Sequence, residues 1–165
     1  MKERTILVKT LSKTYAMTGW RLGYLIADGS LIREMAKVQG FTILSISAAV
    51  QKAAVTALTG PQNFVKEMVD EFNARRMIVI NRLNKMNNIS CKLPEGAFYA
   101  FPNISKIGMK SYDFTELLLE KKKVAVYPGI GFGDHGEGHI RISYAASRER
   151  LKAGLDGLES LVSDL

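Results

Sequence analysis

The sequence predicts an α/β fold built in two parts, and three observations lead to this expectation. The 165 residues are 47% hydrophobic and 24% charged, which is the composition of a globular protein. Short β-branched runs alternate with longer segments whose apolar residues recur at the spacing of a helix. The composition changes near residue 60. We therefore expect one part over residues 1–60 and a second over residues 61–165.

The first part is expected to contain two strands and two helices. Residues 5–10 (TILVKT) predict a strand, and residues 21–28 predict a second strand that ends at the turn sequence DGS. Ser30 is placed to cap a short helix over residues 31–37. The alanine-rich segment 45–58 predicts a buried helix.

The second part opens with a long helix from Pro61 to about residue 86. One apolar face runs along it, made by Phe64, Val65, Met68, Val69, Phe72, Val79, Ile80 and Leu83. Pro61 suits the first helical turn, where its missing N–H would have no partner. A helix of this length would measure about 38 Å, so we expect it to bridge two lobes.

The remainder alternates short strands with two helices. Strands are expected near 89–93, within 97–103, over 124–129 and over 139–145. The sequence DFTE at 113–116 is a capping box, which predicts a helix to about residue 122. Ser147 is expected to cap a helix over 147–162, whose inward face carries Leu151, Leu155, Leu158 and Leu161.

Charge and cysteine content argue against several classes of function. The net charge of +7 is scattered along the chain, so we do not expect nucleic-acid binding. Cys91 is the single cysteine, which excludes an internal disulfide and fits a small buried thiol in a reducing compartment. The sequence HGEGH at 135–139 is read as a glycine-rich turn, with no metal expected. No membrane span or signal peptide is expected, and we place the protein in the cytoplasm.

Lys13 and Arg21 raise a chemical question, because no acidic residue stands in the sequence between them. A lysine amine just past a strand can add to an aldehyde and form a Schiff base. An arginine fork matches a phosphate, and the hydroxyls of Thr10 and Ser12 can donate to the same group. Pyridoxal 5′-phosphate combines an aldehyde with a phosphate at about this reach. The alternative is that both cations are solvated loop residues.

The string SKTYAMTGWRLGY at 12–24 strongly resembles the lysine signature of class I, fold type I pyridoxal-phosphate aminotransferases, the aspartate aminotransferase family. Thr10, Ser12, Lys13, Gly19, Arg21 and Gly23 occupy the places of that pattern. Three later segments, LPEGAFYAF at 93–101, VAVYPGIGFG at 124–133 and GHIRISYAAS at 138–147, also look like family segments in the family's order.

The resemblance implies a role for each matching residue. Lys13 would bind the cofactor aldehyde and move the proton between the substrate α-carbon and the cofactor. Thr10, Ser12 and Arg21 would hold the phosphate, and Arg141 would bind the substrate α-carboxylate. The alternative for Arg141 is an exposed strand residue, since Ile140 and Ile142 should face the opposite side.

The resemblance also implies what is missing. Only one acid, Glu3, precedes Lys13, and it cannot serve as the partner of the cofactor's pyridinium nitrogen. Residues 1–60 are therefore expected to be a remnant of the cofactor-binding large domain, and residues 61–165 a small α+β C-terminal domain. As part of an aminotransferase, the chain would act on an amino acid, with aspartate or an aromatic one favoured, and on a 2-oxo acid.

Two further expectations concern what surrounds the chain. It would form a homodimer or associate with the missing N-terminal part, and residues 1–60 would expose apolar surface that a full enzyme buries. The alternative function is a catalytically inactive truncated domain that serves only as a folding or dimerisation piece.

Overall fold

The structure, a computed structural model, describes residues 2–165. Its contacts divide the chain into two compact units, one reaching to Glu67 and the other spanning Met68–Leu165. The boundary lies inside the long helix α3, Asn63–Leu83, whereas the composition places the change near residue 60. The assignment of the two parts as a large-domain remnant and a small domain stays a prediction.

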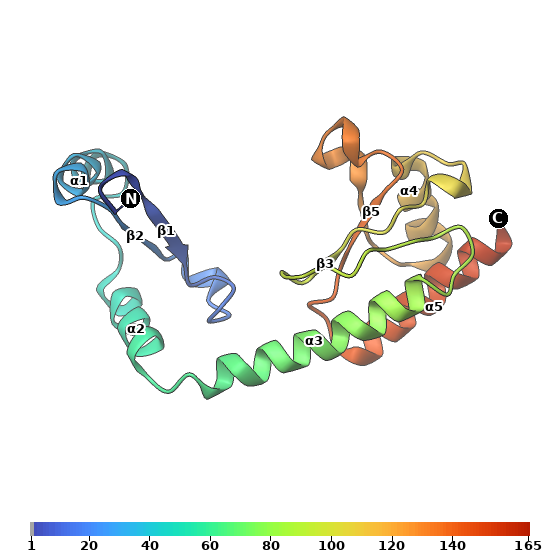
Figure 1. The fold of residues 1–165 in the computed structure, drawn as a ribbon, viewed down its shortest axis with the longest axis horizontal. Helices are drawn as coiled ribbons and strands as arrows, with labels where there is room; N and C mark the ends of the chain where they lie inside the picture. Colours follow the sequence, from blue (N-terminus) through green and yellow to red (C-terminus); the bar gives the residue numbers. More distant parts are fainter. Residues whose placement is uncertain (1) are drawn as a thin grey trace. The chain divides into compact units, whose positions relative to one another are not determined.

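The first unit is a β-hairpin with two helices (Figure 1). Its elements are β1 (Leu7–Thr10), β2 (Gly23–Ile26), α1 (Gly29–Ile43) and α2 (Ala48–Thr59), with short 3-10 turns at Lys2–Arg4 and Thr18–Trp20. The strands pair antiparallel, from Leu7 opposite Ile26 to Thr10 opposite Gly23. Both predicted strands are confirmed, each shorter than expected.

Two predictions for the helices of this unit were wrong in part. Helix α1 begins at Gly29 and continues to Ile43, and its cap is Asp28, whose carboxylate accepts a hydrogen bond from the Ser30 N–H at 2.9 Å. Ser30 therefore lies in the first turn. Helix α2 is present, but only Ala54 in it is buried, because few residues of this unit pack against it.

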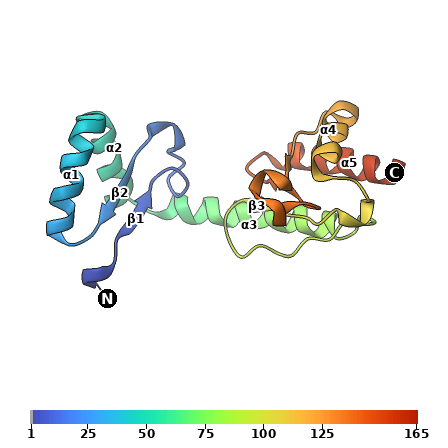
Figure 2. The ribbon, with the colours of Figure 1, turned by 90° about the horizontal axis from the view of Figure 1, so that it is seen from above.

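The second unit places a three-stranded antiparallel sheet against helices (Figures 1 and 2). Its elements after α3 are β3 (Tyr99–Ala100), α4 (Ser111–Lys122), β4 (Tyr127–Pro128), β5 (Ile140–Ser143) and α5 (Arg148–Asp164). The strand order is β3–β5–β4, so the last strand of the chain lies in the middle. Helices α3 and α5 lie side by side in both views, linked by Arg82 to Asp156 and Glu159.

The core of this unit draws apolar side chains from α3, the sheet, α4 and α5. Fully buried members include Val79, Leu83, Ala100, Phe114, Leu118 and Ile140. The four leucines predicted for the inner face of α5 are all buried, which confirms the helical spacing. Cys91 is also buried as expected, and burial raises the pKa of its thiol.

Local signals misplaced three elements of the second unit. The strand expected near 89–93 is only an isolated bridge between Ser90 and Asn103. Pro61 precedes α3, which begins at Asn63. The capping box at 113–116 does not open α4, because that helix begins at Ser111, whose N–H donates to the Glu137 carboxylate at 2.7 Å. A remote carboxylate thus replaces the local cap.

Within residues 2–165, every helix is too short or too polar to span a bilayer.

Candidate functional site

One end of the β1–β2 hairpin collects four of the five predicted site residues. Thr10 is the last residue of β1, and Ser12 and Lys13 follow it directly. Arg21 lies two residues before β2. The Leu11 N–H donates to the Leu22 carbonyl at 3.2 Å, which extends the pairing of the strands by one step. Hairpin pairing therefore brings residues far apart in the loop sequence to the same end.

The two hydroxyls at this end are tied to each other. The Thr10 hydroxyl donates to Ser12 Oγ at 3.0 Å, and Thr10 Oγ1 accepts a hydrogen bond from the Ser12 N–H at 3.2 Å. Thr10 Oγ1 also approaches the Leu22 carbonyl at 3.4 Å. Within the described part of the chain, Ser12 Oγ has no acceptor, so its proton is available to an anion.

Arg21 is fixed by its backbone and by Thr18. Its φ of 53° lies in the left-handed region, which is uncommon for a residue with a side chain. Its Nη1 donates to the Thr18 carbonyl at 3.0 Å, and the Thr18 hydroxyl donates to the Ser12 carbonyl at 2.9 Å. Thr18 therefore connects the arginine to the serine. Sequence reasoning missed Thr18, although a hydroxyl residue three positions before the arginine was a visible signal.

Arg141, the fifth predicted residue, belongs to the second unit and lies on β5. Along this strand Ile140 is fully buried, while Arg141 is half-buried on the other face. Its Cζ lies over three aromatic rings, at 4.5 Å from the centroid of Tyr99, 5.0 Å from Tyr127 and 4.7 Å from Phe132. Arg141 is thus surrounded by rings, which differs from a simple exposed strand residue. No local pattern in the sequence indicated these contacts.

None of the carboxylates within residues 2–165 forms an ion pair with Arg141. A half-buried guanidinium that meets only aromatic faces keeps its N–H donors for an external acceptor. The arrangement suits a carboxylate, whose two oxygens match the arginine fork.

Neither histidine belongs to a metal cluster in the part of the chain that the structure describes. His139 Nδ1 lies 3.1 Å from the Glu137 carbonyl, and Nε2 lies 3.2 Å from Asn103 Nδ2. The Glu137 carbonyl can only accept a hydrogen bond and the Asn103 amide nitrogen can only donate one, so these contacts tie the ring on both sides. His139 therefore acts here as a structural residue beside the sheet.

Known proteins resemble this chain along nearly its whole length. The family model described as aminotransferase class I and II matches residues 1–158. The chain is 48% identical over 159 residues to an aspartate aminotransferase of Pyrococcus horikoshii. This alignment covers 95% of this chain and 41% of that protein. It is 42% identical to aromatic-amino-acid aminotransferase 2 of Thermococcus litoralis, covering 99% of this chain and 42% of that protein.

A solved structure gives the same result. The aromatic aminotransferase from Pyrococcus horikoshii OT3 matches with a TM-score of 0.94 and 42% identity, covering 99% of this chain and 44% of that one. The chain therefore spans about two fifths of the length of the relatives it matches. It belongs to the class I and II aminotransferases, in the aspartate aminotransferase family, and corresponds to their C-terminal region.

Proposed function

We propose that this chain carries the C-terminal part of an aminotransferase active site. The enzyme would move an amino group between an amino acid, with aspartate or an aromatic one favoured, and a 2-oxo acid. The observation that supports this most is the gathering of Thr10, Ser12, Lys13 and Arg21 at one end of the hairpin. The family depends on pyridoxal 5′-phosphate, and these residue types suit the aldehyde and the phosphate of that cofactor.

The hairpin end fits the phosphate of that cofactor. The Ser12 hydroxyl has a proton to donate, and the Arg21 guanidinium uses Nη1 for Thr18 while its other donors remain for an anion. Thr10 orients the Ser12 hydroxyl through the 3.0 Å contact between their oxygens. In this proposal the three side chains hold the phosphate, and Thr18 keeps the arginine and serine in register.

Lys13 follows Ser12 in the chain and has an exposed side chain. It would hold the cofactor aldehyde through its amine and, once displaced by the substrate, take the proton from the substrate α-carbon. The bound cofactor supplies the electron sink that makes this proton removable. Arg141 would bind the α-carboxylate with two parallel hydrogen bonds, which fixes the α-carbon of the substrate.

A second candidate function is a non-catalytic folding or dimerisation piece. It is favoured by the exposed apolar surface of the first unit, which suits association either as a homodimer or with a polypeptide equivalent to the N-terminal part of the relatives. We further propose a cytoplasmic location, on the argument from the single cysteine.

A cofactor titration separates the two functions. We expect the chain to develop a visible absorbance band with pyridoxal 5′-phosphate that is lost in Lys13→Ala. Lys9→Ala is the matched control, because Lys9 is an exposed lysine on β1, outside the site, and reports non-specific reaction of surface amines.

Production of a 2-oxo acid from aspartate or phenylalanine is measured in the same samples. A band that survives in Lys13→Ala would contradict the cofactor site. A Lys13-dependent band without turnover would favour the non-catalytic piece.

A further inference from the structure

The sheet of the second unit has two chemically different faces. Residues directly opposite each other in antiparallel strands share a face. Ala100 pairs with Ile142 and Pro128 with Ile140, and this face turns into the core. The other face carries Arg141, with Tyr127 directly opposite it on β4.

Tyr99 belongs to the same face as Arg141. It pairs with Ser143, which lies two residues along β5 from Arg141, so it is a diagonal neighbour of the guanidinium. The strand register therefore places one tyrosine on each side of Arg141, from β3 and from β4. A cation over an aromatic face is attracted by the negative charge of the ring.

Phe132 supplies the third ring from a loop. It ends the 3-10 turn Gly129–Phe132. The Gly129 N–H donates to the His139 carbonyl at 2.8 Å, and the Ile130 N–H donates to Ser111 Oγ at 3.3 Å. This turn is thereby tied both to the residue before β5 and to the start of α4.

Aromatic contacts also support Phe132 from behind. Its ring meets Phe101 edge-on, with centroids 6.0 Å apart and an interplanar angle of 80°. Phe101 stacks on His139 at 5.0 Å. A continuous series of rings thus runs from His139 to the guanidinium of Arg141.

We propose that Tyr99, Tyr127 and Phe132 are positioning residues that hold Arg141 ready for a carboxylate before the substrate arrives. This inference rests on the carboxylate-binding role proposed above for Arg141. The three rings occupy space around the guanidinium without consuming its N–H donors, and they remove rotamers that a free arginine would sample. A carboxylate then loses less binding energy to ordering of the side chain.

The test uses the full chain and two probes that need no cofactor. 3-Phenylpropionate supplies a carboxylate without an amino group, and 3-phenylpropanamide has the same shape without the charge. Binding is followed by NMR through the aromatic resonances of the ligand, which can be observed with every variant, and relaxation of the Arg141 Nε–H signal reports the order of that side chain before ligand is added. The variants are Tyr127→Leu, Phe132→Leu, Tyr127→Phe and Arg141→Ala. Tyr127 and Phe132 are each more than half exposed, so the melting temperature should hardly change.

We expect each ring-to-leucine variant to weaken 3-phenylpropionate binding by about two- to fivefold and to increase the motion of the Arg141 side chain. Tyr127→Phe keeps the ring and should bind like the parent chain. The amide should bind poorly to all variants.

The positioning role alone would be overturned if both leucine variants kept the affinity and the side-chain order of the parent chain while Arg141→Ala lost binding. Unchanged affinity in Arg141→Ala would instead show that the proposed carboxylate role of Arg141 is wrong, and the inference would fall with it. The Lys13 absorbance test is independent of both results.

Discussion

The two units differ in what their apolar residues contact. In the second unit Phe114 is fully buried, and the core continues from α3 through the sheet to α5. In the first unit Phe41 is 94% exposed, and the buried cluster consists of Leu11, Met17 and Ala54 with a few partly buried neighbours. Both units are rich in apolar residues, so composition does not explain the difference. What differs is whether the described residues supply a second layer to pack against.

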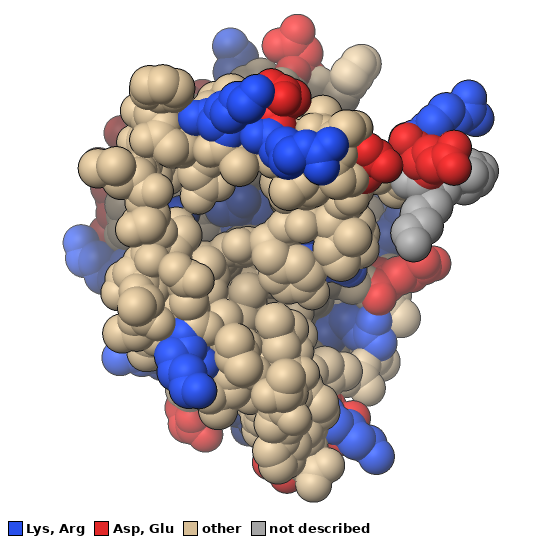
Figure 3. Space-filling view, turned by 90° about the vertical axis from the view of Figure 1, so that its left-hand side faces the viewer, with Lys and Arg blue, Asp and Glu red and all other residues tan. Residues whose placement is uncertain are grey.

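The first unit shows the consequence at its surface. Exposed apolar side chains come from both strands, from α1 and from the residue after it, and include Val8, Ile26, Val38, Ile43 and Leu44. A face made largely of uncharged residues, with charged side chains scattered around it, is visible in the space-filling view (Figure 3). This is the exposure expected from the sequence. A two-stranded hairpin with little packed against it is marginal in water, and such a surface favours association.

The largest expected effect compares two phenylalanines. Phe114→Ala should lower the free energy of unfolding of the second unit by about 3–5 kcal/mol, because it opens a cavity in a closed core. Phe41→Ala should change the stability of the first unit by less than about 0.5 kcal/mol, since its side chain is already in water. Hydrogen exchange resolved over residues 2–67 and 68–165 measures both. Similar losses for the two substitutions would erase the distinction between the units.

A pair of glycines should give effects of opposite sign. A Cβ at position 129 would lie 2.0 Å from the Gly136 carbonyl oxygen and 2.5 Å from that of His139, so Gly129→Ala must displace backbone. We expect a loss of about 2 kcal/mol in the second unit. Gly40→Ala in α1 meets nothing within 4 Å and should stabilise its helix by about 0.5–1 kcal/mol. Thermal melts of the two variants check this, and a stabilising Gly129→Ala would show that the loop is less tightly packed than its geometry indicates.

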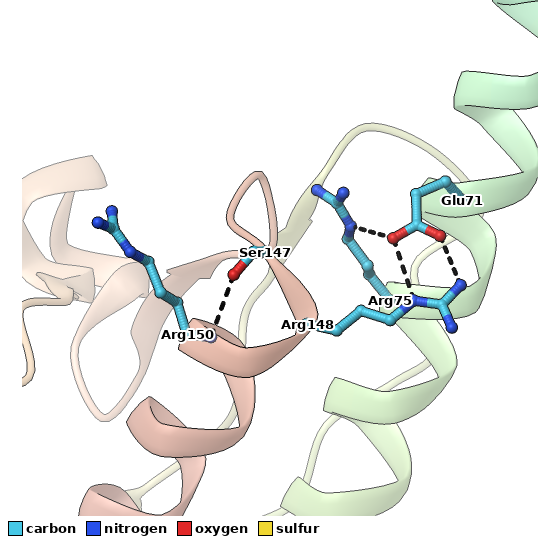
Figure 4. Close-up of polar contacts among 5 residues, drawn as sticks. All are labelled: Glu71, Arg75, Ser147, Arg148 and Arg150. Atoms are coloured by element: carbon cyan, nitrogen blue, oxygen red, sulfur yellow. Dashed lines mark hydrogen bonds and ion pairs between the residues drawn. The ribbon is translucent and has the colours of Figure 1, made fainter.

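Two serines at helix N-caps offer a smaller contrast. The Ser147 hydroxyl accepts the Arg150 N–H at the start of α5, whereas Ser47 makes no side-chain hydrogen bond at the start of α2 (Figure 4 shows the first). Ser147→Ala should cost about 1 kcal/mol and Ser47→Ala close to nothing. Urea unfolding of both variants provides the measurement. An equal cost at both positions would mean that the cap bond is not what Ser147 contributes.

The smallest effect at neutral pH is expected from the ion pairs of Glu71. Its carboxylate joins Arg75 on the same helix and Arg148 at the start of α5 (Figure 4). Hydrogen bonds from Arg148 and then Arg75 lower the pKa of Glu71 from 4.5 to about 2. The charged form is therefore favoured by folding. The stability that it contributes is present above pH 4.5 and is lost as the pH falls towards 2.

Melting temperature as a function of pH tests this contribution. Glu71→Gln should flatten the curve of the second unit between pH 4.5 and 2, with little change at neutral pH because solvent screens the pairs. Glu116→Gln, at an exposed position of α4, is the matched control. If the curve for Glu71→Gln follows that of the parent chain over this range, the ion pairs of Glu71 do not stabilise the contact between α3 and α5.

Local patterns predicted α5 and the two strands β1 and β2 well. Helix α5 follows from a serine cap and leucines at helical spacing, both of which are contained in one segment. The pairing of β1 with β2, which local patterns did not specify, brings Thr10, Ser12 and Arg21 to one end of the hairpin. Predictions failed where a distant residue decided the outcome. The start of α4 depends on Glu137, and the half-burial of Arg141 depends on rings from three other segments.

The sequence by itself determined which residues are candidates for a cofactor site, because a lysine, an arginine and two hydroxyls at fixed spacing can be read from one short segment. The tertiary structure alone decided how Arg141 is presented, since the register of β5 with β3 and β4 and the turn at Phe132 combine residues far apart in the chain. The same reason explains why the apolar residues of the first unit are exposed. Burial is a relation between segments, and the pattern of one segment specifies a face but not its partner.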